Sequence, residues 1–205
     1  MLWGGVADGG GLELRRENDG SVRLRGRFPY NEPAVLSDGG RTGRPRTEVM
    51  ASHAFEYRVN RPDEDIHLLV GHDYDHPLAS RGTGTMTLRD TAAALIFEAT
   101  VTRAIAETTH GRDALAMIGA GLAVGISPGF RIPPERAVPD AEEVEEEDPA
   151  EGMALIRTVK AALLYELSVV TRPAYPMAQI EARSWQPSSL PRVRDLSNPL
   201  KRWRL

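Results

Sequence analysis

The 205-residue sequence contains no cysteine, which excludes disulfide bonds, thiolate metal ligands and a thiol nucleophile. It also lacks a long apolar run, because the longest, residues 114–126, is interrupted by glycine and is too short to span a bilayer. The sequence does not open with a charged leader and an apolar core, so no targeting signal is expected. We therefore expect a soluble protein without a membrane role.

Aromatic residues are scarce at 6%, and the body of the chain has no basic stripe with interleaved aromatics. A direct role in nucleic-acid binding is therefore not expected. The formal charge of −4 is unevenly distributed, because eight of the 29 acidic residues lie within residues 140–151. Like charges repel one another, and prolines flank this stretch. We expect residues 140–151 to form a solvated, disordered insertion between two strands.

Glycine and proline are frequent, at 19 and 15 residues, which indicates many turns and few long helices. Residues 12–14 and 22–24 alternate in polarity on either side of Asn18-Asp19-Gly20, a pattern typical of a β-hairpin. Further strands are expected over residues 66–71, 85–88 and 94–101 and at the end of 156–171, with one helix within 111–122. The pattern predicts a mainly β fold with a few helices.

The length fits one folded domain, because domains usually span about 100–200 residues. We assign residues 12–183 to a single domain that includes the acidic insertion. Residues 1–11 are rich in glycine, and we expect them to be flexible. Residues 184–205 contain prolines and more basic than acidic side chains, which predicts a peripheral or detachable tail.

The densest polar cluster, residues 71–76, follows an apolar strand and contains His72 and His76. A neutral imidazole at a strand end can accept a hydroxyl proton, which makes His72 a candidate general base. An ordinary loop histidine would have the same local sequence. A zinc site is a further alternative, because two histidines four residues apart on a helix can bind this metal. Gly71 and Pro77 disfavour a helix, so no metal ligand is assigned.

Three hydroxyl and carboxyl side chains complete the candidate site. Ser127 precedes Pro128-Gly129, where we expect a sharp turn that leaves its hydroxyl accessible as a nucleophile. A serine at this place can equally be an ordinary turn residue. Glu166 and Ser168 are two residues apart, so they share one face of a strand. Glu166 either orients the imidazole there or faces solvent, and Ser168 is a rival nucleophile.

The order and type of these motifs resemble the prohead protease family of tailed phages, over residues 26–183. The segments that carry the resemblance are residues 25–31, 48–55, 66–73, 84–90, 118–130 and 166–176. Residues 125–130 and 166–176 are the most specific of them. The chain departs from the family pattern at His53, where glycine is usual, and in the charge of the acidic stretch.

The resemblance implies a closed or partly open antiparallel β-barrel with helices around it, similar to herpesvirus assemblin. It also implies that His72 is the general base, Ser127 the nucleophile and Glu166 the residue that orients the histidine. Gly129 and Arg172 are candidates for oxyanion binding or support, although Pro128 has no N–H to donate. No cofactor and no metal is expected.

The function implied by the resemblance is a serine endopeptidase that matures the phage prohead. Its expected partners are the major capsid protein or its scaffolding region and further copies of itself, with self-cleavage at the tail of residues 184–205. The expected location is the assembling prohead within the cytoplasm of the bacterial host. Two alternatives remain open: a non-catalytic β-barrel component of assembly, and a metal-dependent hydrolase that uses His72 and His76.

Overall fold

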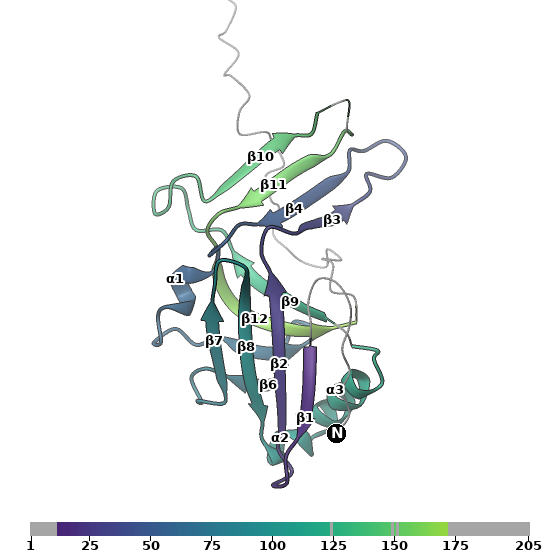
Figure 1. Ribbon diagram of the computed structural model, residues 1–205, viewed down its shortest axis with the longest axis vertical. Coiled ribbons are helices and arrows are strands. Elements are labelled where there is room, and N and C mark those ends of the chain that lie inside the picture. Colours follow the sequence, from purple (N-terminus) through teal and green to yellow (C-terminus); the bar gives the residue numbers. More distant parts are fainter. Residues whose placement is uncertain (1–11, 124, 149, 151, 172–205) are drawn as a thin grey trace, which may run out of the picture.

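The computed structural model describes residues 12–171 except 124, 149 and 151. Within this part the chain forms twelve strands and three short helices (Figure 1). The strands are β1 (Leu12–Arg16), β2 (Val22–Pro29), β3 (Pro33–Ser37), β4 (Arg46–Met50), β5 (His67–Val70), β6 (Asp73–Ser80), β7 (Met86–Asp90), β8 (Ala94–Val101), β9 (Gly125–Arg131), β10 (Glu142–Glu146), β11 (Leu155–Val159) and β12 (Leu163–Val170). The helices are α1 (Glu56–Val59), α2 (Arg103–Ala106) and α3 (Thr109–Gly119).

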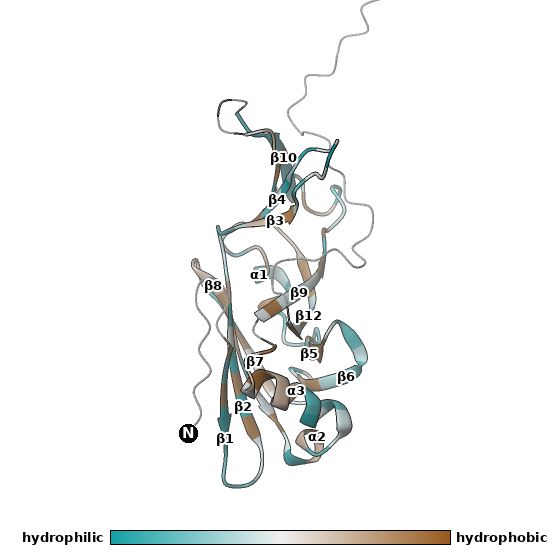
Figure 2. Ribbon diagram, turned by 90° about the vertical axis from the view of Figure 1, so that its right-hand side faces the viewer, coloured by the Kyte–Doolittle hydropathy of each residue, from teal (hydrophilic) through white to brown (hydrophobic). Residues whose placement is uncertain are grey.

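The strands form three sheets of four strands each in the described part of the chain. We call them sheet A (β1-β2-β8-β7), sheet B (β10-β11-β4-β3) and sheet C (β6-β5-β12-β9). Sheet B lies at one end of the molecule, and α2 and α3 lie at the other (Figure 1). Much of β1 and β10 is hydrophilic (Figure 2). The mainly β fold with few helices is confirmed.

The predicted hairpin over residues 12–24 is confirmed as β1 and β2. Buried and exposed residues alternate along β2, and Leu14 pairs with Leu24 across the hairpin. The period of two matches the alternation of side chains between the faces of a strand. Apolar residues can therefore point into the core while the arginines of β2 point to solvent.

The core between sheets A and C contains a cluster of aromatic rings. Phe55, which is fully buried, lies 6.0 Å from Phe28 of β2 and 5.8 Å from Phe130 of β9, measured between ring centroids. Both pairs meet edge to face, the arrangement that the charge distribution of aromatic rings favours. These contacts fix β9 against sheet A from its core-facing side.

Of the expected closed or partly open antiparallel barrel, closure and purely antiparallel pairing are wrong for the described residues. None of the three sheets closes on itself, and β12 pairs in parallel with β5, as β11 does with β4. Closure requires hydrogen bonds between the first and last strands of a sheet. In the described residues, sheet C instead ends at β6 on one side and at β9 on the other.

The sharp turn expected at Pro128-Gly129 is also wrong, because both residues lie inside strand β9. Proline cannot donate a ladder hydrogen bond, so within sheets it is confined mainly to edge strands and bulges. Strand β9 is an edge strand of sheet C, and its pairing with β12 shifts register between Leu164 and Glu166. Position on the edge therefore overrides the local preference for a turn.

The acidic stretch is ordered over part of its length, which corrects the expectation of a disordered insertion. Residues Glu142–Glu146 form β10 and pair with β11. Arg157 of β11 binds Glu142 through its Nε at 2.6 Å and Glu48 through Nη1 at 2.9 Å, and Lys160 binds Glu143 at 2.6 Å. Basic side chains on β11 and directly after it thus offset the repulsion among the acids.

Other expectations concern residues outside the described part. The flexible N-terminus of residues 1–11, the tail of residues 184–205 and the Arg172 side chain all belong there. No helix in the described part is both long enough and apolar enough to cross a membrane.

Candidate active site

His72 lies in the two-residue turn between β5 and β6. Gly71 and His72 have φ values of 62° and 65°, and Val70 pairs with Asp73 across the turn. Positive φ at both central residues is the pattern of a tight type I′ hairpin. A residue other than glycine is uncommon in this conformation, so the backbone at His72 carries strain. The turn leaves 45% of the imidazole side chain exposed to solvent.

Glu166 holds the ring of His72. Its Oε1 lies 2.6 Å from His72 Nδ1, and the Glu166 side chain is only 5% exposed. Strand β12 runs parallel to β5 with Val169 opposite Val70, so the part of β12 that carries Glu166 lies beside the strand that leads into the His72 turn. This hydrogen bond is the main reason that the pKa of His72 is raised above its usual value, since partial burial of the ring acts in the opposite direction.

Ser168 connects the same two residues a second time. Its hydroxyl donates to Glu166 Oε2 at 2.7 Å and accepts the backbone N–H of His72 at 2.8 Å. Ser168 is fully buried, at 0% exposure. Its one proton is therefore committed to a carboxylate, and solvent does not reach it.

Ser127 lies directly opposite Ser168 on the neighbouring strand β9. Side chains of residues paired across an antiparallel ladder lie on the same face, with Cβ atoms about 4.5–5.5 Å apart. Ser127 is 6% exposed, and its hydroxyl makes no hydrogen bond with another residue in the described ranges. The Ser127 hydroxyl, which has no hydrogen bond to any residue in those ranges, therefore lies one strand away from the hydroxyl that binds Glu166.

Gly129 lies opposite Glu166 and makes room for its carboxylate. A Cβ atom on Gly129 would lie only 2.6 Å from Cδ of Glu166 and 2.8 Å from its Cγ. Real Cβ contacts are essentially never this short, so any larger residue would displace the carboxylate. Glycine at position 129 is thus required by the Glu166 side chain that packs over β9.

The two nitrogens of the His72 ring have different surroundings. Nδ1 faces Glu166, whereas Nε2 makes no hydrogen bond to any residue that the structure describes, including Ser127. Hydrogen bonds of a catalytic site are often long or open before substrate binds. With Nδ1–H held by a carboxylate, the lone pair of Nε2 is the part of the ring that can accept a proton.

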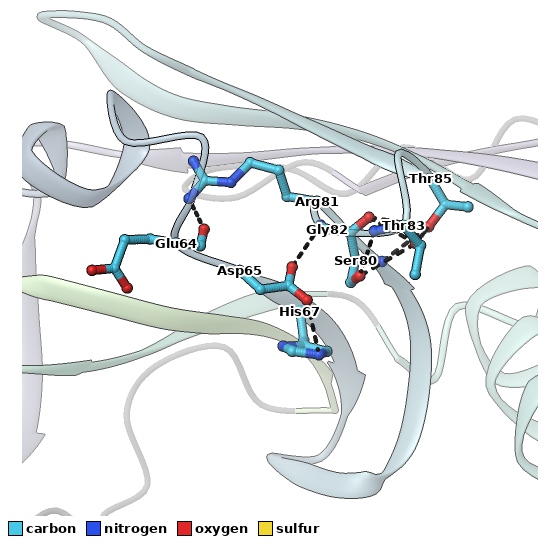
Figure 3. A network of polar contacts seen from close by, with 8 residues as sticks. All are labelled: Glu64, Asp65, His67, Ser80, Arg81, Gly82, Thr83 and Thr85. Atoms are coloured by element: carbon cyan, nitrogen blue, oxygen red, sulfur yellow. Dashed lines mark hydrogen bonds and ion pairs between the residues drawn. The ribbon is translucent and has the colours of Figure 1, made fainter.

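A network of polar contacts anchors the hairpin of β5 and β6 (Figure 3). Arg81 donates to the carbonyl oxygens of Arg58 and Val59 at 3.1 and 3.0 Å. It also donates to the carbonyl of Glu64, and Asp65 accepts the N–H of Gly82 at 2.7 Å. The base of the hairpin is therefore fixed by side chains that bind backbone groups, while His72 lies at its tip.

The metal-site alternative does not match the arrangement of the two histidines. His72 lies in the hairpin turn and contacts Glu166, whereas His76 lies on β6 with its Nδ1 3.0 Å from Asp73 Oδ2. Among the described residues there is no group of three histidine, aspartate or glutamate side chains that could hold a metal ion. Because this segment is a turn followed by a strand, the spacing of four residues does not place the two histidines together as it would on a helix.

The structure brings His72, Glu166 and Ser127 to the same region of sheet C, at the turn and on two adjacent strands. Sequence reasoning named all three. It did not anticipate that Ser168 binds both His72 and Glu166. The spacing of two between Glu166 and Ser168 was the available signal, because it places both side chains on one face of β12.

Comparison with protein families matches residues 34–190 to the family described as Caudovirus prohead serine protease. This range covers more than half of the 205 residues and includes every residue of the site. The chain belongs to this family. It is accordingly a serine protease, and membership of the family implies a role in maturation of the capsid. No curated protein and no solved structure matches it.

The resemblance to herpesvirus assemblin in fold therefore stays a prediction. The identity of the catalytic residues also does not follow from the family match alone. The contacts of His72, Glu166, Ser168 and Ser127 bear on that identity.

Proposed function

We propose that this prohead protease hydrolyses peptide bonds with Ser127 as nucleophile, His72 as general base and Glu166 as the residue that orients His72. The observation that carries the proposal is the 2.6 Å contact between His72 Nδ1 and Glu166 Oε1, with the Ser127 hydroxyl on the adjacent strand. A base, a carboxylate that orients it and a nearby hydroxyl are the parts of a serine-protease triad, in which geometry and not chain order defines the roles.

The reaction begins with neutral His72, protonated on Nδ1 and bonded to Glu166. Ser127 Oγ attacks the peptide carbonyl carbon while His72 Nε2 takes the hydroxyl proton, which forms a C–O bond and a tetrahedral oxyanion. The imidazolium then gives this proton to the departing amine as the C–N bond breaks. The acyl-enzyme is hydrolysed by water, with His72 again accepting a proton and returning it to Ser127.

Ser127 is favoured over Ser168 because the Ser127 hydroxyl has no hydrogen bond to a carboxylate among the described residues, whereas the Ser168 hydroxyl does. The Ser168 proton lies on a 2.7 Å bond to a carboxylate, and Ser168 accepts from the backbone of His72 and not from its ring. Ser168 is also the more deeply buried of the two serines, at 0% exposure against 6% for Ser127. The same argument removes Ser168 as a nucleophile without removing it from the site.

Stabilisation of the oxyanion requires N–H donors near Ser127. The residue after the nucleophile, Pro128, has no N–H, so the next amide along β9 is that of Gly129. In this proposal Gly129 supports the site in two ways. Its N–H is a donor for the oxyanion, and its lack of a side chain leaves space for Glu166. Help from Arg172, outside the described residues, stays a prediction.

The substrate is the major capsid protein or its scaffolding region, cleaved inside the assembling prohead in the cytoplasm of the bacterial host. Family membership supports this choice over a non-catalytic β-barrel component of assembly. Contact between copies of the protease and cleavage within its own residues 184–205 form part of the proposal. Mass spectrometry of active protein and of Ser127→Ala should show a shortened chain only in the former.

The test of the proposal is cleavage of the capsid protein during co-assembly with wild-type enzyme or with single variants. Ser127→Ala and His72→Ala are expected to leave the capsid protein at full length. Ser37→Ala, at the exposed end of β3, is the matched serine control and should cleave as the wild type does. Cleavage by Ser127→Ala at the wild-type rate would show that the nucleophile lies elsewhere.

A further inference from the structure

The turn that carries His72 is attached to β12 by two successive backbone amides. The N–H of Gly71 donates to the carbonyl of Val169 at 3.0 Å, and the N–H of His72 donates to Ser168 Oγ at 2.8 Å. The first bond connects backbone to backbone and does not depend on a side chain. The second exists only because residue 168 has a hydroxyl, and it acts on the residue whose φ is 65°.

The same hydroxyl determines where the Glu166 carboxylate points. Glu166 Oε1 binds the His72 ring and Oε2 accepts from Ser168 at 2.7 Å, so each oxygen has its own partner. A carboxylate with both oxygens bonded is fixed about its last torsion angle, a rotation that is otherwise soft. Glu166 is almost completely buried, so water cannot replace a missing partner freely.

We propose that Ser168 is a positioning residue, whose hydroxyl sets both the rotamer of Glu166 and the backbone of His72 relative to each other. This inference rests on the proposed function, because it needs His72 and Glu166 to be the base and its orienting carboxylate. Ser168 closes a ring of contacts: His72 ring to Glu166, Glu166 to Ser168, and Ser168 to the His72 backbone. Neither the base nor the carboxylate can move without breaking one of them.

Removal of the hydroxyl should act on the chemical step and on the titration of His72. In Ser168→Ala the carboxylate loses one of its two partners and rotates, which weakens its bond to Nδ1. We expect kcat to fall by about 10–100-fold, the range typical of residues that orient another functional group, with KM unchanged. Because the bond to Glu166 raises the pKa of His72, the pKa should fall toward its ordinary value.

The experiment measures kcat, KM and their pH dependence on a peptide substrate, together with an NMR titration of His72. Ser168→Thr keeps the hydroxyl and should restore most of kcat and the raised pKa. Ser80→Ala is the matched control, since Ser80 is 5% exposed and bonds Thr83 away from the site. It is expected to cost stability without moving the pH profile. If Ser168→Ala does not fold, Ser168→Cys, with a weaker donor, should show an intermediate fall in both quantities.

The outcomes separate this inference from the proposed function. A wild-type kcat and pH profile in Ser168→Ala, with Ser127→Ala inactive, would overturn the positioning role alone. Loss of stability in Ser168→Ala without a change in the pKa of His72 would assign a merely structural role. Activity in Ser127→Ala combined with complete loss in a folded Ser168→Ala would make Ser168 the nucleophile and overturn both proposals.

Discussion

Replacement of Gly129 by alanine tests the packing of the site through a single methyl group. The new Cβ would lie 2.6 Å from Cδ of Glu166, so either the carboxylate or β9 has to move. Gly129 is not among the residues with positive φ, which means that alanine is tolerated by the backbone itself. The perturbation therefore starts at the contact between residue 129 and Glu166.

The size of the effect follows from how far the carboxylate is displaced. Overpacking of this kind costs about 1–3 kcal/mol of stability. A displacement of the carboxylate by roughly 1 Å should cost about 10²-fold in kcat/KM. Complete loss of the bond between Glu166 and His72 should cost on the order of 10⁴-fold, as when the carboxylate of a triad is neutralised. We expect kcat/KM of Gly129→Ala to fall between these limits.

The assay is peptide cleavage at a temperature where the variant is fully folded, with stability measured by denaturant unfolding. Gly26→Ala is the control, because its Cβ would lie 2.5 Å from Cζ of Phe97 in sheet A, a similar clash away from the site. It should lose stability and keep wild-type kcat/KM. The reasoning is refuted if Gly129→Ala retains full activity, or if Gly26→Ala loses as much activity as Gly129→Ala.

Three further predictions follow from the same structure. Because the pKa of His72 is raised and the base must be neutral, kcat/KM should increase with pH through a value above the ordinary imidazole range; a profile that is flat over about pH 5–8 contradicts this. Glu166→Gln should lower kcat on the order of 10⁴-fold and shift that increase to lower pH, and an unshifted profile would exclude Glu166 as its cause. Arg157→Met should destabilise the fold by about 3–5 kcal/mol in urea unfolding, since it removes the buried cation that contacts Glu48 and Glu142; a loss below about 1 kcal/mol would show that these ion pairs contribute little to stability.

The sign of the His72 effect on stability is opposite to that on activity. The pKa of His72 is raised in the folded protein, so its pairing with Glu166 contributes stability at pH values below the unfolded pKa. This contribution is lost as pH increases through the folded pKa. Activity increases over the same interval, because the base loses its proton.

The strands and the candidate residues were accessible from the sequence because their signals are local. The alternation in β2 and the apolar run of β5 each predict a strand without knowledge of its partners. The order of His72, Ser127 and Glu166 with their flanking motifs indicated the family. Which atoms meet was not accessible, because the contact of His72 with Glu166 joins residues 94 positions apart through parallel pairing of β5 and β12.

The errors share a physical cause, since in each a distant partner overrides local preference. Pro128 and Gly129 favour a turn, yet an edge position on sheet C tolerates proline and Glu166 requires the glycine. The acids of β10 favour disorder until Arg157 and Lys160 are placed beside them. Closure of a barrel is likewise a property of the whole sheet and of no single segment.

The central claim is that Ser127 is the nucleophile and that His72 activates it. The most direct measurement is mass-spectrometric mapping of the adduct formed by a fluorophosphonate probe on protease assembled with capsid protein. The account predicts an adduct on Ser127 that disappears in His72→Ala. An adduct on Ser168, or equal labelling of Ser127 in His72→Ala, would contradict it.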